Sequence, residues 1–179
     1  RVGDAVAAAK ADGQPAVAIT DHGNMFGVLD FYKACRDAGI TPIIGTEAYM
    51  AHDHRSERPT RRGRLDDSGG DTEGGKKLYY HLTLLAENNQ GYRNLIQLAS
   101  LAFLEGYYYK PRIDKQLLAD HKDGLIALSG CLASEIPEWI QKDQLPRARE
   151  AIDWFKQTLG PDNFYLELQH HGLPEQAKV

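Results

Sequence analysis

Hydrophobic residues along the chain fall into two patterns that alternate with each other. Short continuous apolar runs, such as residues 15–19, are typical of strands that are buried on both faces of a sheet. Longer segments, such as residues 25–38, repeat apolar residues every three or four positions, and this spacing is typical of amphipathic helices. Glycine or proline separates most of the segments, which supports the boundaries between them.

These patterns predict an alternation of strands and helices. Strands are expected at residues 15–19, 40–50, 78–86, 124–131 and 163–169. Helices are expected at residues 2–11, 25–38 with Asn24 as the cap, 88–104, 114–119 with Asp114 as the cap, 134–141 and 145–159. Such alternation is typical of an α/β fold whose parallel strands are joined by crossover helices. Open doubly wound sheets and closed barrels both satisfy it, and in either one a functional site lies beyond the carboxyl ends of the strands.

Residues 52–77 do not follow either pattern. They have almost no apolar content and include five glycines, and their charges are mainly positive at first and mainly negative later. A segment of this composition buries too little apolar surface to join a core, so we predict a mobile, charged surface insertion. A long insertion of this kind costs little stability. Contact with a partner protein is an alternative role for it.

The composition is that of one ordinary soluble domain. Of the 179 residues, 42% are hydrophobic and 26% are charged. The net charge of -4 gives no basic surface of the kind that a stand-alone nucleic-acid binder usually has, although a nucleic-acid substrate remains open. Two cysteines, Cys35 and Cys131, make no disulfide framework and predict a cytoplasmic location.

Membrane association and secretion are not expected. No stretch approaches the roughly 20 apolar residues of a membrane span. The chain begins with Arg1 instead of methionine and shows no signal-peptide pattern. We therefore expect the sequence to be an excerpt of a longer chain.

Residues of types that commonly bind metals lie in or near several of the predicted strands. Asp21 and His22 close the first strand, Glu47 lies late in the second, His81 lies inside the third, and Cys131 ends the fourth. Parallel strands in one sheet would bring these ends together. Imidazole, carboxylate and thiolate groups are ligands for zinc, or for mixed zinc, manganese and iron sites. The end of the fifth strand adds Glu167, Gln169, His170 and His171.

Each of these residues also has an ordinary structural explanation. His22 could cap a backbone group, His81 could be a core histidine, and Cys131 could be a small core residue. Glu47 is harder to explain in this way, because a buried carboxylate needs a partner or a metal. Asp21 is better placed to orient a histidine than to bind an ion. Cys35 is assigned to the core, and solvent exposure is expected for His52, His54 and His121.

Five segments together resemble the PHP (polymerase and histidinol phosphatase) domain at the start of the bacterial replicative DNA polymerase III alpha subunit. The resemblance covers nearly the whole chain except residues 52–77, and it is more specific than the motif TDHG alone. The segments are AVAITDHGNMFGVLDFYKACRDAGITPIIGTEAYM, YYHLTLLAENNQGYRNLIQLAS, EGYYYKPRID, LIALSGCLASEIP and FYLELQHHGLPEQ.

The resemblance implies a distorted, seven-stranded β/α barrel similar to a TIM barrel, with up to three divalent metal ions. It implies that His22, Glu47, His81 and Cys131 bind metal and that His22 and His81 are catalytic, and Asp21 matches a neighbouring aspartate of the same motif. The first His-x-His motif and the late Asp-x-His motif of the family are absent from residues 1–179. The chain is therefore expected to be an incomplete PHP domain whose barrel is not closed.

The implied function has two parts. The parent chain would be a DNA-directed DNA polymerase that uses magnesium, deoxynucleotides and DNA, with a sliding clamp and a separate proofreading subunit as partners and with its polymerase active site outside this sequence. The PHP region would be a 3'–5' exonuclease in which Lys110 and Arg112 face phosphate oxygens, or else these two residues belong to a packed loop. A small-molecule phosphatase of the histidinol-phosphatase kind and an inactive, metal-stabilised scaffold are the alternatives.

Overall fold

The computed structural model describes residues 1–60 and 78–179 of the chain. The described part contains an alternation of helices and strands. The helices are α1 (Val2–Ala11), α2 (Val28–Ala38), α3 (Asn89–Leu104), α4 (Lys115–Asp120), α5 (Glu135–Gln141), α6 (Leu145–Leu159) and α7 (Pro174–Lys178). The strands are β1 (Ala16–His22), β2 (Thr41–Met50), β3 (Tyr80–Ala86), β4 (Arg112–Ile113), β5 (Leu125–Leu128) and β6 (Phe164–Tyr165).

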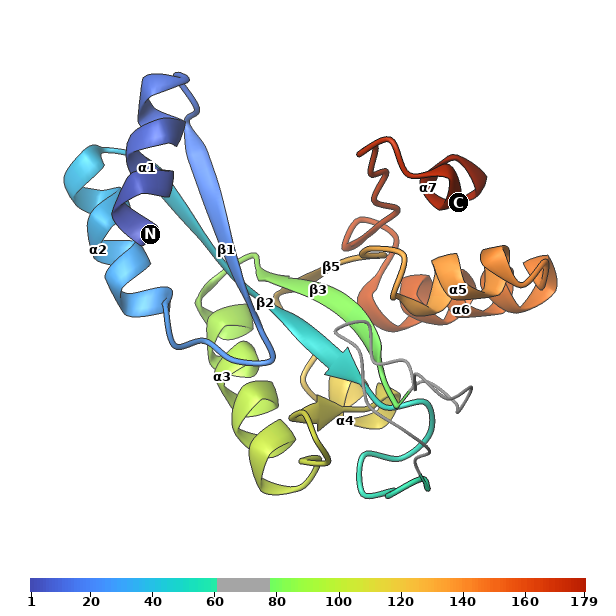
Figure 1. The fold of residues 1–179 in the computed structure, drawn as a ribbon. Coiled ribbons are helices and arrows are strands. Elements are labelled where there is room, and N and C mark those ends of the chain that lie inside the picture. The colour runs from blue at the N-terminus through green and yellow to red at the C-terminus, as the bar shows by residue number, and fades with distance from the viewer. Residues whose placement is uncertain (61–77) are drawn as a thin grey trace.

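The strands form one six-stranded mixed sheet in the order β1-β2-β3-β5-β6, and β4 pairs with β2 beyond the end of β1. The pairs β1–β2, β2–β4 and β5–β6 are parallel. Strand β3 is antiparallel to both of its neighbours, so it runs opposite to the other five strands. Figure 1 shows β2 and β3 crossing the centre of the molecule.

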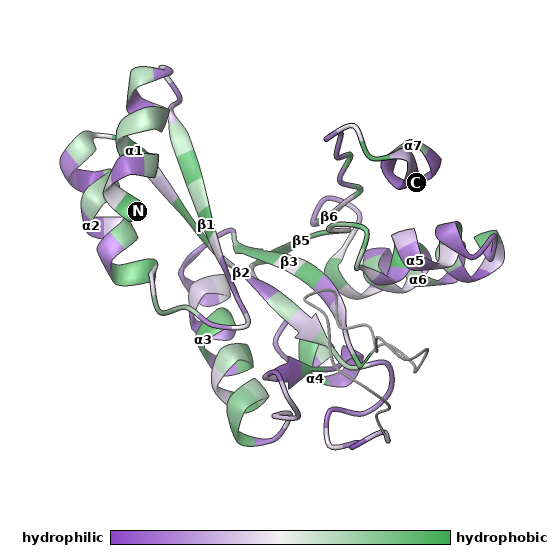
Figure 2. Cartoon of the chain, in the orientation of Figure 1, coloured by the Kyte–Doolittle hydropathy of each residue, from purple (hydrophilic) through white to green (hydrophobic). Residues whose placement is uncertain are grey.

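Two main core clusters lie between the sheet and the helices, and both lie on the same face of the sheet. Ile19 and Ile44 pack with residues of α1 and α2, and Ala48 and Leu84 belong to the larger cluster with α3, α5 and α6. These four strand residues share a face, because the register pairs Ile19 with Ile44 and side chains alternate along β2. Helices α2 and α3 carry both hydrophobic and hydrophilic residues, as Figure 2 shows.

The expected helices are confirmed with small shifts at their ends. The largest shift is in α2, which begins at Val28 and not at Met25. Its N-cap residue is Gly27. Asn24 does not cap this helix: its side-chain oxygen accepts a hydrogen bond from the Phe26 N–H and so stabilises the turn before it. The strands expected at 124–131 and 163–169 are shorter, at four and two residues.

The prediction of an all-parallel sheet is wrong for β3. Strand β3 pairs antiparallel with β2 and with β5, and an apolar run has the same appearance in the sequence for either strand direction. The described residues do not close the seven-stranded barrel that the resemblance implies, as expected for an incomplete domain. In the described residues the sheet is open, and β1 and β6 form its two edges.

The first nine residues of the predicted mobile insertion are anchored to the domain. Arg55 forms ion pairs with Glu105 and with the buried Asp114, at 2.6 and 3.0 Å. The Arg112 guanidinium donates hydrogen bonds to the backbone oxygens of Arg55 and Glu57. Residues 52–60 are therefore held against β4 and α4, and residues 61–77 lie outside the described part.

The Asp114 carboxylate is the centre of this anchor. It accepts hydrogen bonds from the backbone N–H of Arg55 and from the Leu117 N–H at the start of α4. Burial acts to raise the pKa of Asp114, but these two hydrogen bonds and the Arg55 side chain outweigh it and lower the pKa.

No helix in the described ranges combines the length and hydrophobicity of a membrane span.

Replacing Asp114 by Ala should lower the free energy of unfolding by about 3 kcal/mol, because the change leaves Arg55 without its buried partner and removes the α4 cap. Chemical denaturation measures this loss. The matched control is Asp120→Ala, which removes an exposed carboxylate whose recorded partner is Gln116, and it should cost less than about 0.5 kcal/mol.

The same comparison has a defined pH dependence. A carboxylate with a lowered pKa stabilises the fold fully above its unfolded pKa of about 3.9 and loses this effect as the pH falls through the folded-state value. The stability difference between the native chain and the Ala variant should therefore shrink below about pH 4. A difference that stays constant down to pH 2 would contradict this role for Asp114.

Candidate metal centre

The pairing of three strands places His22, Glu47 and His81 on one face of the sheet. His22 at the end of β1 is in register with Glu47 on β2. On β3, Thr83 is opposite Glu47 and His81 is opposite Tyr49, so Glu47 and His81 are diagonal neighbours with side chains on the same face. This face is opposite to the one that α1, α2 and α3 cover.

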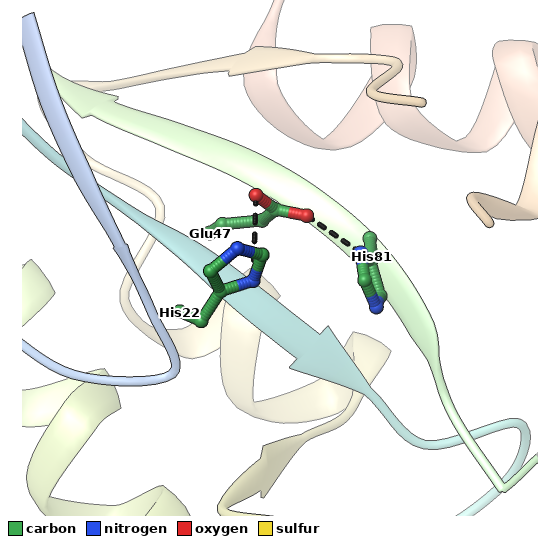
Figure 3. A group of neighbouring side chains, drawn as sticks. All are labelled: His22, Glu47 and His81. Atoms are coloured by element: carbon green, nitrogen blue, oxygen red, sulfur yellow. Dashed lines mark ion pairs between the residues drawn. The ribbon is translucent and has the colours of Figure 1, made fainter. Parts of the chain in front are cut away.

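The Glu47 carboxylate lies between the two imidazoles (Figure 3). One of its oxygens is 2.5 Å from Nδ1 of His81, and the other is 3.6 Å from Nδ1 of His22. The His81 side chain is 7% exposed, whereas the His22 side chain is 62% exposed. The site is therefore anchored in the sheet on one side and open to solvent on the other.

Cys131 joins this group through His81. Its Sγ atom is 3.7 Å from Nδ1 of His81. Cys131 follows β5 by three residues, after the turn at Gly130. It does not end the strand as the sequence suggested, but the turn brings its thiol back to β3.

These contacts shift the acidity of three side chains. Burial acts to lower the pKa of His81, but the hydrogen bonds with Cys131 and Glu47 outweigh it and raise the pKa to about 9. For Glu47, burial acts to raise the pKa, and the neighbouring imidazoles outweigh it and lower the pKa. For Cys131, burial also acts to raise the pKa, but the His81 hydrogen bond and the Ala133 N–H lower it. The arrangement thus favours the charged forms of both Glu47 and His81.

The cluster fits a divalent metal ion. Donor atoms of His22, Glu47 and His81 all lie within 4.8 Å of one another. Ligands at about 2.1 Å from a tetrahedral zinc ion lie roughly 3.4 Å apart, so small side-chain movements would enclose an ion. The buried Nε2 of His81 has no hydrogen-bond partner in the described part of the chain, and a buried imidazole nitrogen normally has a partner or a ligand. Nitrogen, carboxylate and thiolate donors suit zinc, and the first two also suit manganese or iron.

Asp21 occupies a different place from the one expected. Its carboxylate accepts a hydrogen bond of 2.9 Å from the Gly27 N–H at the start of α2. Side chains of consecutive strand residues point to opposite faces, so Asp21 points toward the helices while His22 points to the cluster. Asp21 thus connects β1 to α2, and its observed partner is not a histidine.

The two basic residues expected to face phosphate differ in their surroundings. Arg112 is 1% exposed and donates to the backbone oxygens of Gly106, Arg55 and Glu57. It is therefore a structural residue, and the expectation that it faces phosphate is wrong. Lys110 is partly exposed, and its Nζ lies 5.5 Å from the centre of the Tyr49 ring beside the cluster.

The other histidines and acids singled out in the sequence lie elsewhere. Cys35 is fully buried among residues of α1 and α2, as expected for a core residue. His52 stacks on Tyr80, and His54 is 3.8 Å from the Asp114 carboxylate, so both have protein partners. The remaining candidates are hydrogen-bonded away from the cluster or exposed: His121, Glu167, Gln169, His170 and His171.

Tyr49 is the residue of this centre that sequence reasoning missed. Its ring contacts the rings of both His22 and His81. In the sequence it looks like an ordinary aromatic residue of a buried strand. The available signal was its spacing, because a residue two positions after Glu47 on a strand shares the same face.

The sheet and the cluster of imidazole, carboxylate and thiolate agree with a metal-binding α/β domain, and comparison with known families assigns the class. The family model of the PHP domain matches residues 1–171. The chain therefore belongs to the PHP domain family.

Within this family, the similar relatives are replicative polymerase subunits. DNA polymerase III subunit alpha of Thermus aquaticus is 50% identical over 92% of this chain. The subunits alpha of Treponema pallidum and Borreliella burgdorferi are 46% and 44% identical over 97% and 100% of the chain. The chain spans only 12–14% of the length of these three relatives.

A solved structure is also similar in part. It is a protein of Bifidobacterium adolescentis that is provisionally assigned as a metal-dependent phosphoesterase, with a TM-score of 0.39 and 13% identity over 98% of this chain and 74% of that one. Nothing about function follows from a likeness at this level.

Replacing Glu47 by Gln should lower the affinity for Zn²⁺ by more than about 100-fold, because the change removes the only carboxylate of the cluster in the described residues while it preserves the shape of the side chain. Competition with a chromophoric chelator measures the affinity. Glu87→Gln, an exposed change at the far end of the same sheet, should leave it unchanged. Equal zinc affinity in the Glu47 variant and the native chain would remove Glu47 from the site.

Proposed function

We propose that residues 1–179 are a metal-dependent phosphodiesterase-type PHP domain that acts as a 3'–5' exonuclease within a replicative DNA polymerase III alpha chain. One observation carries the proposal: side chains from three strands bring two imidazoles and a carboxylate within 4.8 Å, and the Cys131 thiol lies 3.7 Å from one of the imidazoles. All four ligands that the family resemblance implies are present. This favours catalysis over a role as an inactive scaffold.

The residues of the cluster have distinct tasks in this proposal. His22, Glu47, His81 and Cys131 hold divalent metal ions, which supply a water of lowered pKa and stabilise negative charge on the leaving oxygen. His81 is fixed by Glu47 and Cys131, whereas the exposed His22 faces the solvent from which a phosphodiester approaches. Lys110, beside the cluster, supplies a positive charge for a phosphate oxygen.

The parent chain gives the domain its substrate and its partners. By analogy with the relatives, it polymerises deoxynucleotides on a DNA template with magnesium, at carboxylates that lie outside residues 1–179. Its partners are DNA, the sliding clamp and a separate proofreading subunit, and its location is the cytoplasm. Further strands from the parent chain would close the open sheet into the seven-stranded barrel of the family and complete the set of metal ligands.

His22→Ala and Cys131→Ala, each made in the full-length chain, should reduce the release of mononucleotides from a mismatched 3' end at least 100-fold, because each change removes a metal ligand. Gel analysis of a labelled primer measures this release. Primer extension by the same variants should remain, since the polymerase carboxylates lie elsewhere.

A matched histidine change controls for general damage. His121 is hydrogen-bonded to the Leu117 backbone oxygen, away from the cluster, and His121→Ala should retain the exonuclease activity. Unchanged mononucleotide release in both ligand variants would refute the exonuclease proposal and favour the scaffold. Hydrolysis of a phosphorylated small alcohol, without release of mononucleotides, would favour a small-molecule phosphatase instead.

A further inference from the structure

Tyr49 occupies a position that touches both histidines of the metal centre. It lies two residues after Glu47 on β2 and directly opposite His81 on β3, so its side chain emerges on the same face of the sheet. The residue is only 5% exposed. It belongs to a small cluster with Leu78 and Tyr79 that is separate from the two main cores.

The ring of Tyr49 limits the orientation of both imidazoles. It stacks on His22 with the ring centres 6.3 Å apart and an interplanar angle of 23°. It meets His81 edge-on at 5.4 Å and 77°. Both distances lie within the range of about 4.5–7 Å for favourable aromatic pairs. The effect matters most for His22, because its side chain is 62% exposed and few neighbours restrict its rotation.

Two further neighbours, Gly23 and Lys110, lie against the ring of Tyr49. A Cβ atom at Gly23, the residue after His22, would lie 2.7 Å from the Tyr49 ring, so the turn after β1 packs directly against the ring. Nζ of Lys110 lies 5.5 Å from the ring centre, within reach of a cation–π interaction. One aromatic ring thus contacts the turn that carries His22, the His81 ligand and the nearby cation.

We propose that Tyr49 is a positioning residue of the metal centre, and that its ring holds the His22 and His81 imidazoles in the orientation that binds the ion. The inference rests on the proposed metal site. The side chain acts through the ligands and does not itself bind the ion. The ring is required, because the contacts with His22, His81 and Lys110 are all made by the aromatic face or edge.

Tyr49→Leu in the full-length chain should lower the affinity for Zn²⁺ by about 10–100-fold, the loss that follows when a group orienting a ligand is removed. Competition with a chromophoric chelator gives the affinity. Tyr49→Phe keeps the ring and should stay within about twofold of the native chain.

Tyr80→Leu is the matched control. Tyr80 is equally buried at 5%, lies on the neighbouring strand opposite Met50, and stacks on His52, which is not in the cluster. Its loss should disturb packing to a similar degree and leave zinc affinity unchanged. Equal zinc binding by Tyr49→Leu and the native chain would overturn the inference, and so would an equal loss in Tyr80→Leu.

A second pair of variants covers the case in which Tyr49→Leu does not fold. Gly23→Ala should displace the Tyr49 ring and weaken zinc binding, whereas Gly13→Ala, at a similar positive φ with no atom within 4 Å of the added carbon, should not. Full zinc affinity in Gly23→Ala would overturn the positioning role. A native chain that binds no zinc would overturn the metal site together with this inference. A native chain that binds zinc but has no exonuclease activity would refute the exonuclease proposal and leave the positioning role of Tyr49 unaffected.

Discussion

The candidate centre depends on one interaction, the partly buried Glu47 carboxylate held between the imidazoles of His22 and His81. A carboxylate in a sheet is costly unless positive charge or hydrogen bonds compensate for its lost hydration. Two imidazoles supply that compensation, and a metal ion would supply more of it. The three side chains therefore pair through Glu47 and form a candidate set of ligands, while the buried Nε2 of His81 has no hydrogen-bond partner in the described residues.

The direction of β3 makes this arrangement possible. In an all-parallel sheet, the start of β3 would lie beside the starts of β1 and β2, far from the ends of those strands where His22 and Glu47 lie. Because β3 is antiparallel, its second residue, His81, lies opposite Tyr49 near the end of β2. The helices α1, α2 and α3 cover the other face and supply the core beneath the sheet, so the His22 side chain stays exposed on the open face. The reversal of one strand thus brings His81 to the end of the sheet where His22 and Glu47 lie, and the alternation of side chains along the strands places all three on the same face.

Local patterns predicted the elements well, and long-range pairing much less well. Apolar spacing located α1, α3, α5 and α6 nearly to the residue, and glycines mark the ends of α1 and α6. Strand direction was not predictable in the same way, since a buried apolar run reads alike in either direction. The candidate ligands His22, Glu47 and His81 were predicted from residue type and resemblance, and the antiparallel pairing of β3 that brings them together was not predicted from the sequence.

The errors at the site come from the surroundings of single residues. Arg112 resembled a phosphate ligand, but three backbone oxygens enclose its guanidinium. Asp21 precedes His22 in the chain and yet points to the other face, toward Gly27. Tyr49 was not singled out in the sequence, because its contacts with the His22 and His81 rings depend on how the strands pair. Such properties follow from tertiary contacts, and composition alone does not contain them.

The most direct test of the account is anomalous diffraction from crystals of the full-length chain soaked with Zn²⁺. The account predicts an anomalous peak on the open face of the sheet at about 2.0–2.3 Å from donor atoms of His22, Glu47 and His81. Ordered zinc bound elsewhere in the chain, with these three side chains still paired to one another and no peak between them, would contradict it.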